Sequence, residues 1–145
     1  MSHHKEKYEN FIWVLSVVNE MIDETMYHTQ TFAHALRLHD NEKAAKVFFL
    51  AFEQFKAEKV IVAKHTQNSD LQTIPPWEIP FPEYQHPSSH LTDVHYQMTE
   101  TEAIKAIERM IGAHQTFYEC LLKESRAEKV ISCVDLLLKH HVQWK

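Results

Sequence analysis

Four ionisable side chains of the sequence could combine to bind a transition metal: Glu58, His114, His141 and His28. The first three fall on the apolar stripes of predicted helices and His28 falls at the edge of one, so all four are expected to face a helical core. A buried carboxylate is unfavourable unless it is paired or bound to a metal. Imidazole and carboxylate ligands together suit iron, zinc or manganese. The spacing therefore predicts one buried metal site at mid-bundle, with Gln54 beside it.

The same residues also permit an interpretation without a metal. Glu58 and His114 could form a hydrogen-bonded pair in the core, because histidine is often half-buried without any ligand role. Three further histidines, His86, His90 and His95, lie close together in the sequence, but their spacing matches no standard metal site. The pattern alone leaves the metal site and the core pair as open alternatives.

Four amphipathic segments are expected to position these residues. Apolar residues recur at alternating steps of three and four, which is typical of helices with one buried face. The predicted helices span about residues 5–38, 42–65, 99–124 and 127–143. Asp40 or Asn41 is the predicted N-cap of the second helix, and Thr99 with Glu102 forms a capping-box pattern at the third. The predicted fold class is all-α, with residues 1–145 forming a single four-helix-bundle domain.

The segment 66–98 contains all five prolines of the chain, so it is not expected to form a regular helix. We interpret it as a long crossover between two helical hairpins, which makes the second and third helices parallel. In that arrangement Glu58 and His114 lie at the same height, each about four turns from the start of its helix.

The crossover is also rich in aromatic residues, including Trp77, Phe81 and Tyr84. Such a composition is too apolar for a flexible linker, so the segment is expected to pack along the outside of the bundle. Aromatic side chains are also common at interfaces. The sequence therefore predicts a homodimer or another protein contact at this segment.

Composition excludes several classes of function. The formal net charge of −5 gives no reason to expect nucleic acid or an anionic membrane as a partner. A single glycine argues against phosphate-binding loops and dinucleotide turns. Two cysteines do not make a disulfide framework, and no apolar run reaches the length of a membrane span. We therefore expect a cytoplasmic protein that binds neither nucleic acid nor membrane.

The pattern of short loop, long crossover and short loop resembles the ferritin and rubrerythrin superfamily. Glu20, with Tyr27 seven residues later, has a spacing that rubrerythrins use. Ala51-Phe52-Glu53 is similar to the point where the family continues into a Glu-x-x-His motif. The resemblance implies a ferritin-like bundle and a non-haem iron protein with redox or metal-handling activity, which includes oxidoreductases.

The di-iron motif of that superfamily is degenerate in this sequence. Lys56 stands three residues after Glu53 instead of a histidine, and Ile111 and Leu137 occupy positions where glutamates are expected. These departures motivate the alternative of a metal-free ferritin-like scaffold that acts through dimerisation or protein–protein interaction. The pair His114 and Glu119 is also similar to one helix of hemerythrins, but the matching pairs are missing from the other helices. The sequence identifies no small-molecule substrate.

Overall fold

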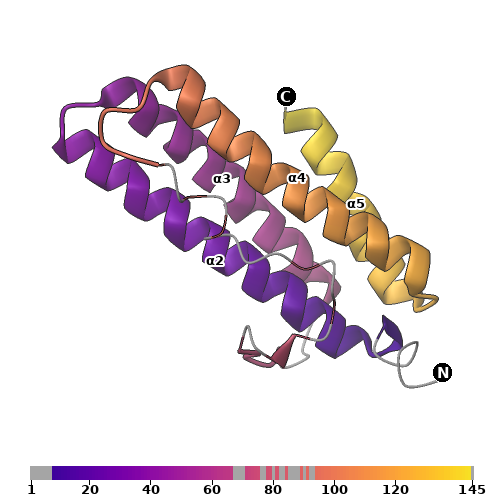
Figure 1. Cartoon of the computed structure of the whole chain (residues 1–145). Helices are drawn as coiled ribbons and strands as arrows, with labels where there is room; N and C mark the ends of the chain where they lie inside the picture. The colour runs from indigo at the N-terminus through magenta and orange to yellow at the C-terminus, as the bar shows by residue number, and fades with distance from the viewer. Residues whose placement is uncertain are drawn as a thin grey trace.

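The computed structural model describes residues 8–66, 71–75, 78–79, 81, 84, 89, 91 and 94–144, with side chains through His141. Within these residues the protein is all-helical and has no strand. The helices are α2 Phe11–Leu38, α3 Glu42–His65, α4 Glu100–Glu124 and α5 Glu128–Trp144 (Figure 1). The prediction of an all-α protein with four long helices is therefore confirmed. No helix in this part of the chain is long and apolar enough to cross a membrane.

The first long helix begins later than the apolar period predicts. The expected start is near Lys5, but α2 begins at Phe11, because Asn10 acts as its N-cap and its side chain accepts a hydrogen bond from the Trp13 N–H at 3.1 Å. A cap of this kind satisfies a backbone donor that the first helical turn leaves free. Tyr8 and the residue after it are helical, but Asn10 interrupts the helix between them and α2.

The turn between α2 and α3 is a compact helix stop built without glycine. Asp40 adopts a left-handed conformation with φ of 59°. The Asp40 N–H donates to the Arg37 carbonyl at 3.0 Å, and the Asn41 N–H donates to the Leu36 carbonyl at 2.8 Å. This pair of bonds is the Schellman pattern, which satisfies the last carbonyls of a helix. The chain reverses within three residues, so α3 runs antiparallel to α2 (Figure 1).

Asn41 also fixes where α4 begins. Its Oδ1 atom accepts a hydrogen bond from the Ala44 N–H at 3.3 Å and so caps α3. Its Nδ2 group donates to the carbonyls of Tyr96 and Met98 at 2.9 and 2.8 Å, immediately before α4. The two helices therefore start at the same end of the molecule and run in parallel, as Figure 1 shows. The predicted capping box of Thr99 is present at the α4 start.

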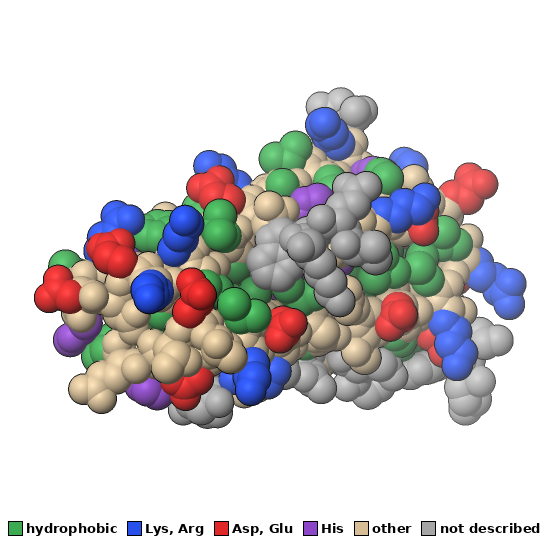
Figure 2. Space-filling view, turned by 90° about the horizontal axis from the view of Figure 1, so that it is seen from above, with side chains coloured by type: hydrophobic (Ala, Val, Ile, Leu, Met, Phe, Trp, Pro, Cys, Tyr) green, Lys and Arg blue, Asp and Glu red, His purple; other side chains and the backbone are tan. Residues whose placement is uncertain are grey.

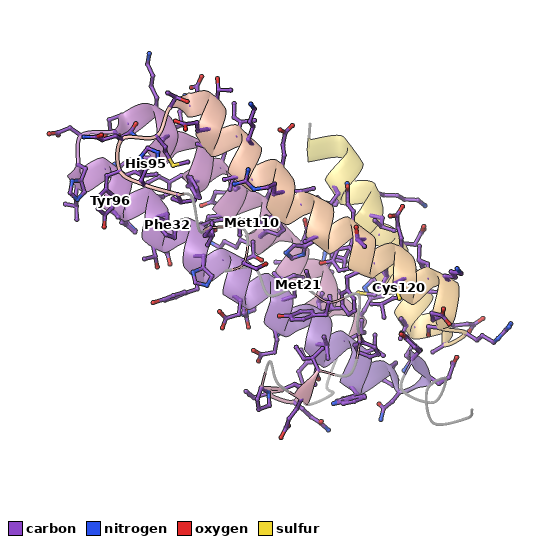
Figure 3. All side chains as sticks on the ribbon, viewed as in Figure 1. Met21, Phe32, His95, Tyr96, Met110 and Cys120 are labelled. Atoms are coloured by element: carbon purple, nitrogen blue, oxygen red, sulfur yellow. The ribbon has the colours of Figure 1, made fainter. Side chains whose placement is uncertain are left out.

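The remaining connections close the bundle. At the end of α4, Ser125 Oγ donates to the Tyr8 carbonyl at 2.6 Å, which brings the α4–α5 turn to the beginning of α2. Helix α5 then returns antiparallel to α4 (Figure 1). Met21 of α2 and Met110 of α4 are buried between the helices (Figure 3). The core thus lies along the common axis of the four helices.

The segment between α3 and α4 is described only in part. Three of its apolar side chains, Ile74, Phe81 and Leu91, are buried and join the core. The ring of Phe81 lies 5.6 Å from that of Phe117 on α4. Trp77, which the sequence singles out as an interface residue, lies outside the described residues. The described part of this segment therefore packs on the helices through apolar contacts.

Candidate metal centre

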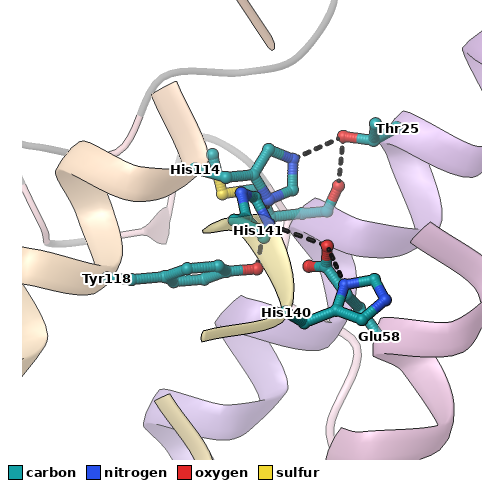
Figure 4. Close-up of polar contacts among 7 residues, drawn as sticks. Thr25, Glu58, His114, Tyr118, His140 and His141 are labelled. Carbon is teal, nitrogen blue, oxygen red and sulfur yellow. Dashed lines mark hydrogen bonds and ion pairs between the residues drawn. The ribbon is translucent and has the colours of Figure 1, made fainter. Parts of the chain in front are cut away.

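One buried cluster brings together a carboxylate and two imidazoles from three different helices. Glu58 of α3, His114 of α4 and His141 of α5 are 2%, 1% and 2% exposed. Each offers a ligand atom that lies within 4.8 Å of the other two (Figure 4). Three of the four metal ligands that the sequence predicts are therefore neighbours in the core.

Cap positions explain why Glu58 and His114 meet. Glu58 lies sixteen residues after Glu42, and His114 lies fourteen residues after Glu100, so each is about four turns into its helix. Because Asn41 holds the two helix starts together, residues at equal distance from those starts are level with each other. His141 reaches the same height from the opposite direction, along the returning helix α5.

The contact between Glu58 and His141 is close but is not an ordinary hydrogen bond. Glu58 Oε2 lies 2.7 Å from His141 Nε2. Even so, His141 Nε2 lacks an aligned hydrogen bond, and so do His141 Nδ1 and Glu58 Oε1 within the described structure. Buried polar atoms without partners are unfavourable and uncommon. Ligand atoms that share one metal ion at about 2.1 Å stand roughly 3 Å apart, so this crowding is close to what a shared ion requires.

The hydrogen bonds around His114 assign the protons on its ring. The Thr25 hydroxyl donates its one hydrogen to the Met21 carbonyl at 2.8 Å. At 2.8 Å from His114 Nε2 the same hydroxyl oxygen must then accept, so Nε2 carries the ring proton. His114 Nδ1 is left as an acceptor, and the Tyr118 hydroxyl donates to it at 3.1 Å. A histidine that ligates a metal commonly donates its other ring N–H in this way, so His114 would bind a metal through Nδ1 once the Tyr118 hydroxyl gave up its hydrogen bond to that atom.

The electrostatics keep the carboxylate ionised and the nearby phenol neutral. Burial would raise the pKa of Glu58, but the hydrogen bond from His140 and the contacts with His141 and His114 outweigh it, so its pKa is lowered. Burial, together with the Glu58 charge, raises the pKa of Tyr118 well above its ordinary value. The cluster therefore contains an ionised carboxylate with a protonated hydroxyl beside it.

Two histidines differ from their expected positions. His28 does not join the cluster, because its Nε2 atom lies 3.6 Å from Glu24 Oε2 on the same helix. His28 follows Thr25 by three residues, which turns its side chain roughly 60° away from that of Thr25. The helical period of the sequence places His140 on the solvent side of the last helix, but its Nδ1 atom lies 3.3 Å from Glu58 Oε2. The long Glu58 side chain reaches His140 from α3. In the sequence, the only indication of this contact was that His140 is adjacent to His141.

A small cavity borders the cluster. Its volume is about 10 Å³, enough for roughly one water molecule. Gln54, Phe55, Glu58, Ile111 and His141 line it. Gln54 therefore lies beside the cluster, as the sequence predicts. A metal ion bound by these three protein ligands would retain at least one open coordination position, which distinguishes reactive sites from closed structural ones.

Comparison of this chain with protein-family models, curated proteins and solved structures finds no significant match. The function therefore has to be inferred from the geometry of the cluster.

Proposed function

We propose that this protein binds one transition-metal ion through Glu58, His114 Nδ1 and His141 Nε2, and that it is a non-haem iron protein with a redox or metal-handling role. The observation that carries the proposal is the convergence of these buried groups, together with Glu58 Oε1 and His141 Nδ1, which have no hydrogen-bond partner within the described residues. Two histidines and one carboxylate with open positions form the ligand set of many non-haem Fe(II) proteins. Zinc and manganese accept the same ligands, so the metal analysis below includes them.

We also propose a ferritin-like bundle for the chain. Helices α3 and α4 start at one end and run in parallel, which requires a long connection between two antiparallel hairpins. One mononuclear site would then replace the two-metal site of that superfamily. Thr25, which has no charge, occupies the point where α2 approaches His114.

The surrounding residues orient the ligands and exclude water. Thr25 holds His114 in the tautomer that offers Nδ1, and the Tyr118 hydroxyl, which donates to Nδ1 at 3.1 Å, would give up that hydrogen bond when an ion binds. The Phe55 ring lies 4.7 Å from the His114 ring and 5.9 Å from the His141 ring, so it covers both imidazoles. A bound iron would supply one-electron or Lewis-acid chemistry at this position. Tyr118 would provide a proton donor next to the open coordination position.

A metal-free scaffold that acts by dimerisation is the second candidate function. His140 favours it, because its hydrogen bond already stabilises the Glu58 charge without an ion. The exposed apolar side chains of Leu50 and Ile104 could then serve an interface between two copies. This candidate predicts a stable dimer and no specific metal.

Metal analysis separates the two candidates. The protein should be purified without a nickel column, because it contains twelve histidines. We expect about one iron, zinc or manganese ion per chain, as isolated or after anaerobic Fe(II) loading. Glu58→Gln should reduce the bound metal to a small fraction, whereas the exposed-histidine control His34→Gln should retain it. Metal content near zero in the wild type after loading would contradict the proposal.

A further inference from the structure

A surface groove lies between the first halves of α3 and α4. Its volume is about 640 Å³, within the range of small-molecule sites. The floor is aliphatic and is formed by Val47, Leu50, Ile104, Ile107 and Ile111. Leu50 and Ile104 are 53% and 43% exposed, so this apolar surface is open to solvent. Figure 2 views the bundle from above and shows hydrophobic side chains between charged ones on that face.

The groove lies where α5 does not cover α3 and α4. Helix α5 has 17 residues and α4 has 25, so α5 is eight residues shorter than the helix along which it returns. Eight helical residues correspond to about 12 Å. Helix α5 packs against both α3 and α4, and the length it does not cover is the beginning of those two helices (Figure 1). Among the described residues, their apolar faces therefore meet no fourth helix there.

The groove ends next to the candidate metal cluster, and one side chain separates the two. Ile111 lines the groove and also lines the small cavity that holds Glu58 and His141. On α3, Leu50, Gln54 and Glu58 are spaced by four residues, so they form one row from the groove to the cluster. Ile111 is 7% exposed, and its side chain is the wall between the two spaces.

The polar groups at each end limit which ligand fits. At the inner end, Glu58 Oε1 is a buried acceptor without a hydrogen-bond partner among the described residues. The rim carries Glu100 and Glu108 with one cation, Lys46. These carboxylates disfavour an anionic ligand, and an O–H group satisfies an unpaired carboxylate oxygen. The small inner cavity admits a single oxygen-sized head group.

The geometry points to a binding site for an elongated aliphatic alcohol, whose chain lies on the groove floor and whose hydroxyl passes Ile111 to reach Glu58. This inference deepens the proposed function, because it identifies the class of molecule that reaches the open metal position. It rests on that function only for the contact between the hydroxyl and the metal.

The first experiment tests the groove without a metal. Calorimetric titration of metal-free protein with 1-octanol should show saturable binding. Leu50→Arg and Ile104→Arg should each weaken it by about tenfold or more, because they place a charge on the apolar floor. The matched control Leu136→Arg alters an equally exposed apolar residue of α5 outside the groove and should leave binding unchanged. Equal affinity in all four proteins, or no binding to any of them, would overturn the inference.

The second experiment tests the passage to the cluster. In protein loaded with Co(II), 1-octanol should shift the visible absorption bands of the metal. Ile111→Phe should abolish the shift while cobalt remains bound, and Ile111→Val should preserve it. If octanol leaves the cobalt absorption bands of the wild type unchanged, the inference is overturned. Octanol binding in the groove of a protein that takes up no cobalt would contradict the proposed metal function and leave the groove site intact.

Sedimentation distinguishes a second copy of the chain from a small ligand. If the wild type and Leu136→Arg form a dimer that Leu50→Arg does not, and none of them binds octanol, the groove is a contact between copies. That result would overturn the inference. A monomeric wild type that binds octanol supports it.

Discussion

Glu58 Oε2 and His141 Nε2 approach to 2.7 Å in the core, although the two atoms lack the alignment of a hydrogen bond. Two buried polar groups from α3 and α5 thus form a close ion pair, which leaves Glu58 Oε1 and His141 Nδ1 without a hydrogen-bond partner among the described residues. His114 Nδ1 points towards the same region from α4. The proposed metal ion would account for the convergence of the three groups on one point.

Thr25 is predicted to hold His114 in one tautomer. Thr25→Val keeps the side-chain shape but removes the acceptor for the Nε2 proton. An unsatisfied buried donor costs about 1–3 kcal/mol, so the free energy of unfolding should fall by that amount in urea titrations of the metal-free protein. Thr25→Ser, which keeps the hydroxyl, is the control and should lose less. Equal losses in both variants would show that packing and not the hydrogen bond matters here.

Asn41 is predicted to perform two separable functions. Asn41→Asp keeps an oxygen that caps α3 but loses the amide that donates to Tyr96 and Met98, whereas Asn41→Ala loses both. We expect Asn41→Ala to be the less stable by about 0.5–2 kcal/mol, the usual effect of a lost cap. Thermal unfolding of the two variants measures this difference. If Asn41→Asp is no more stable than Asn41→Ala, the cap contributes nothing.

The pair of His140 and Glu58 should make the metal-free protein most stable at mildly acidic pH. The folded pKa of Glu58 lies below its ordinary 4.5, so its contribution is present above pH 4.5 and is lost as the pH falls through the folded value. The hydrogen bond with Glu58 raises the pKa of His140 above its ordinary 6.5, so that contribution is complete below pH 6.5 and is lost as the pH rises through the folded value.

The destabilising effect of His140→Gln should therefore be greatest between pH 4.5 and 6.5 and should diminish on either side. Urea titrations of the metal-free proteins from about pH 4 to about pH 9 measure it. His34→Gln, at an exposed position, serves as the control and should show no such maximum. An effect of His140→Gln that does not change with pH would contradict the assigned ion pair.

Gly112 is predicted to be replaceable with a gain in stability. It lies inside α4, and a Cβ atom added there meets no atom within 4 Å. Glycine in a helix interior is less favourable than alanine by roughly 0.5–1 kcal/mol. Gly112→Ala should therefore raise the unfolding free energy by about that amount in urea titrations. A destabilised variant would indicate that the glycine has a role in close packing or in ligand access.

The starts of α3 and α4 were predictable from their cap residues. Asn41 and Thr99 precede α3 and α4, whose starts follow directly from the sequence. Counting turns from those starts also predicted that Glu58 and His114 would be level. The predicted start of α2 was wrong because apolar residues recur on both sides of Asn10. The apolar period alone does not reveal that the Asn10 side chain caps a new helix.

The finer membership of the cluster could not be predicted from helical phase. Thr25 and His28 differ by roughly 60° around α2, and only the packing of α2 on α4 decides which of them faces the centre. His140 seemed to face solvent by the same count. Its contact depends on how far the Glu58 side chain reaches between α3 and α5, and the sequence contains no measure of that distance.

Anomalous diffraction from crystals loaded anaerobically with Fe(II) tests the central claim most directly. We predict one anomalous peak between Glu58, His114 and His141, about 2.0–2.2 Å from Glu58 oxygen, His114 Nδ1 and His141 Nε2. Crystals of Glu58→Gln should lack the peak. Wild-type crystals with no peak in this cluster, or with iron bound only at surface histidines, would contradict the account.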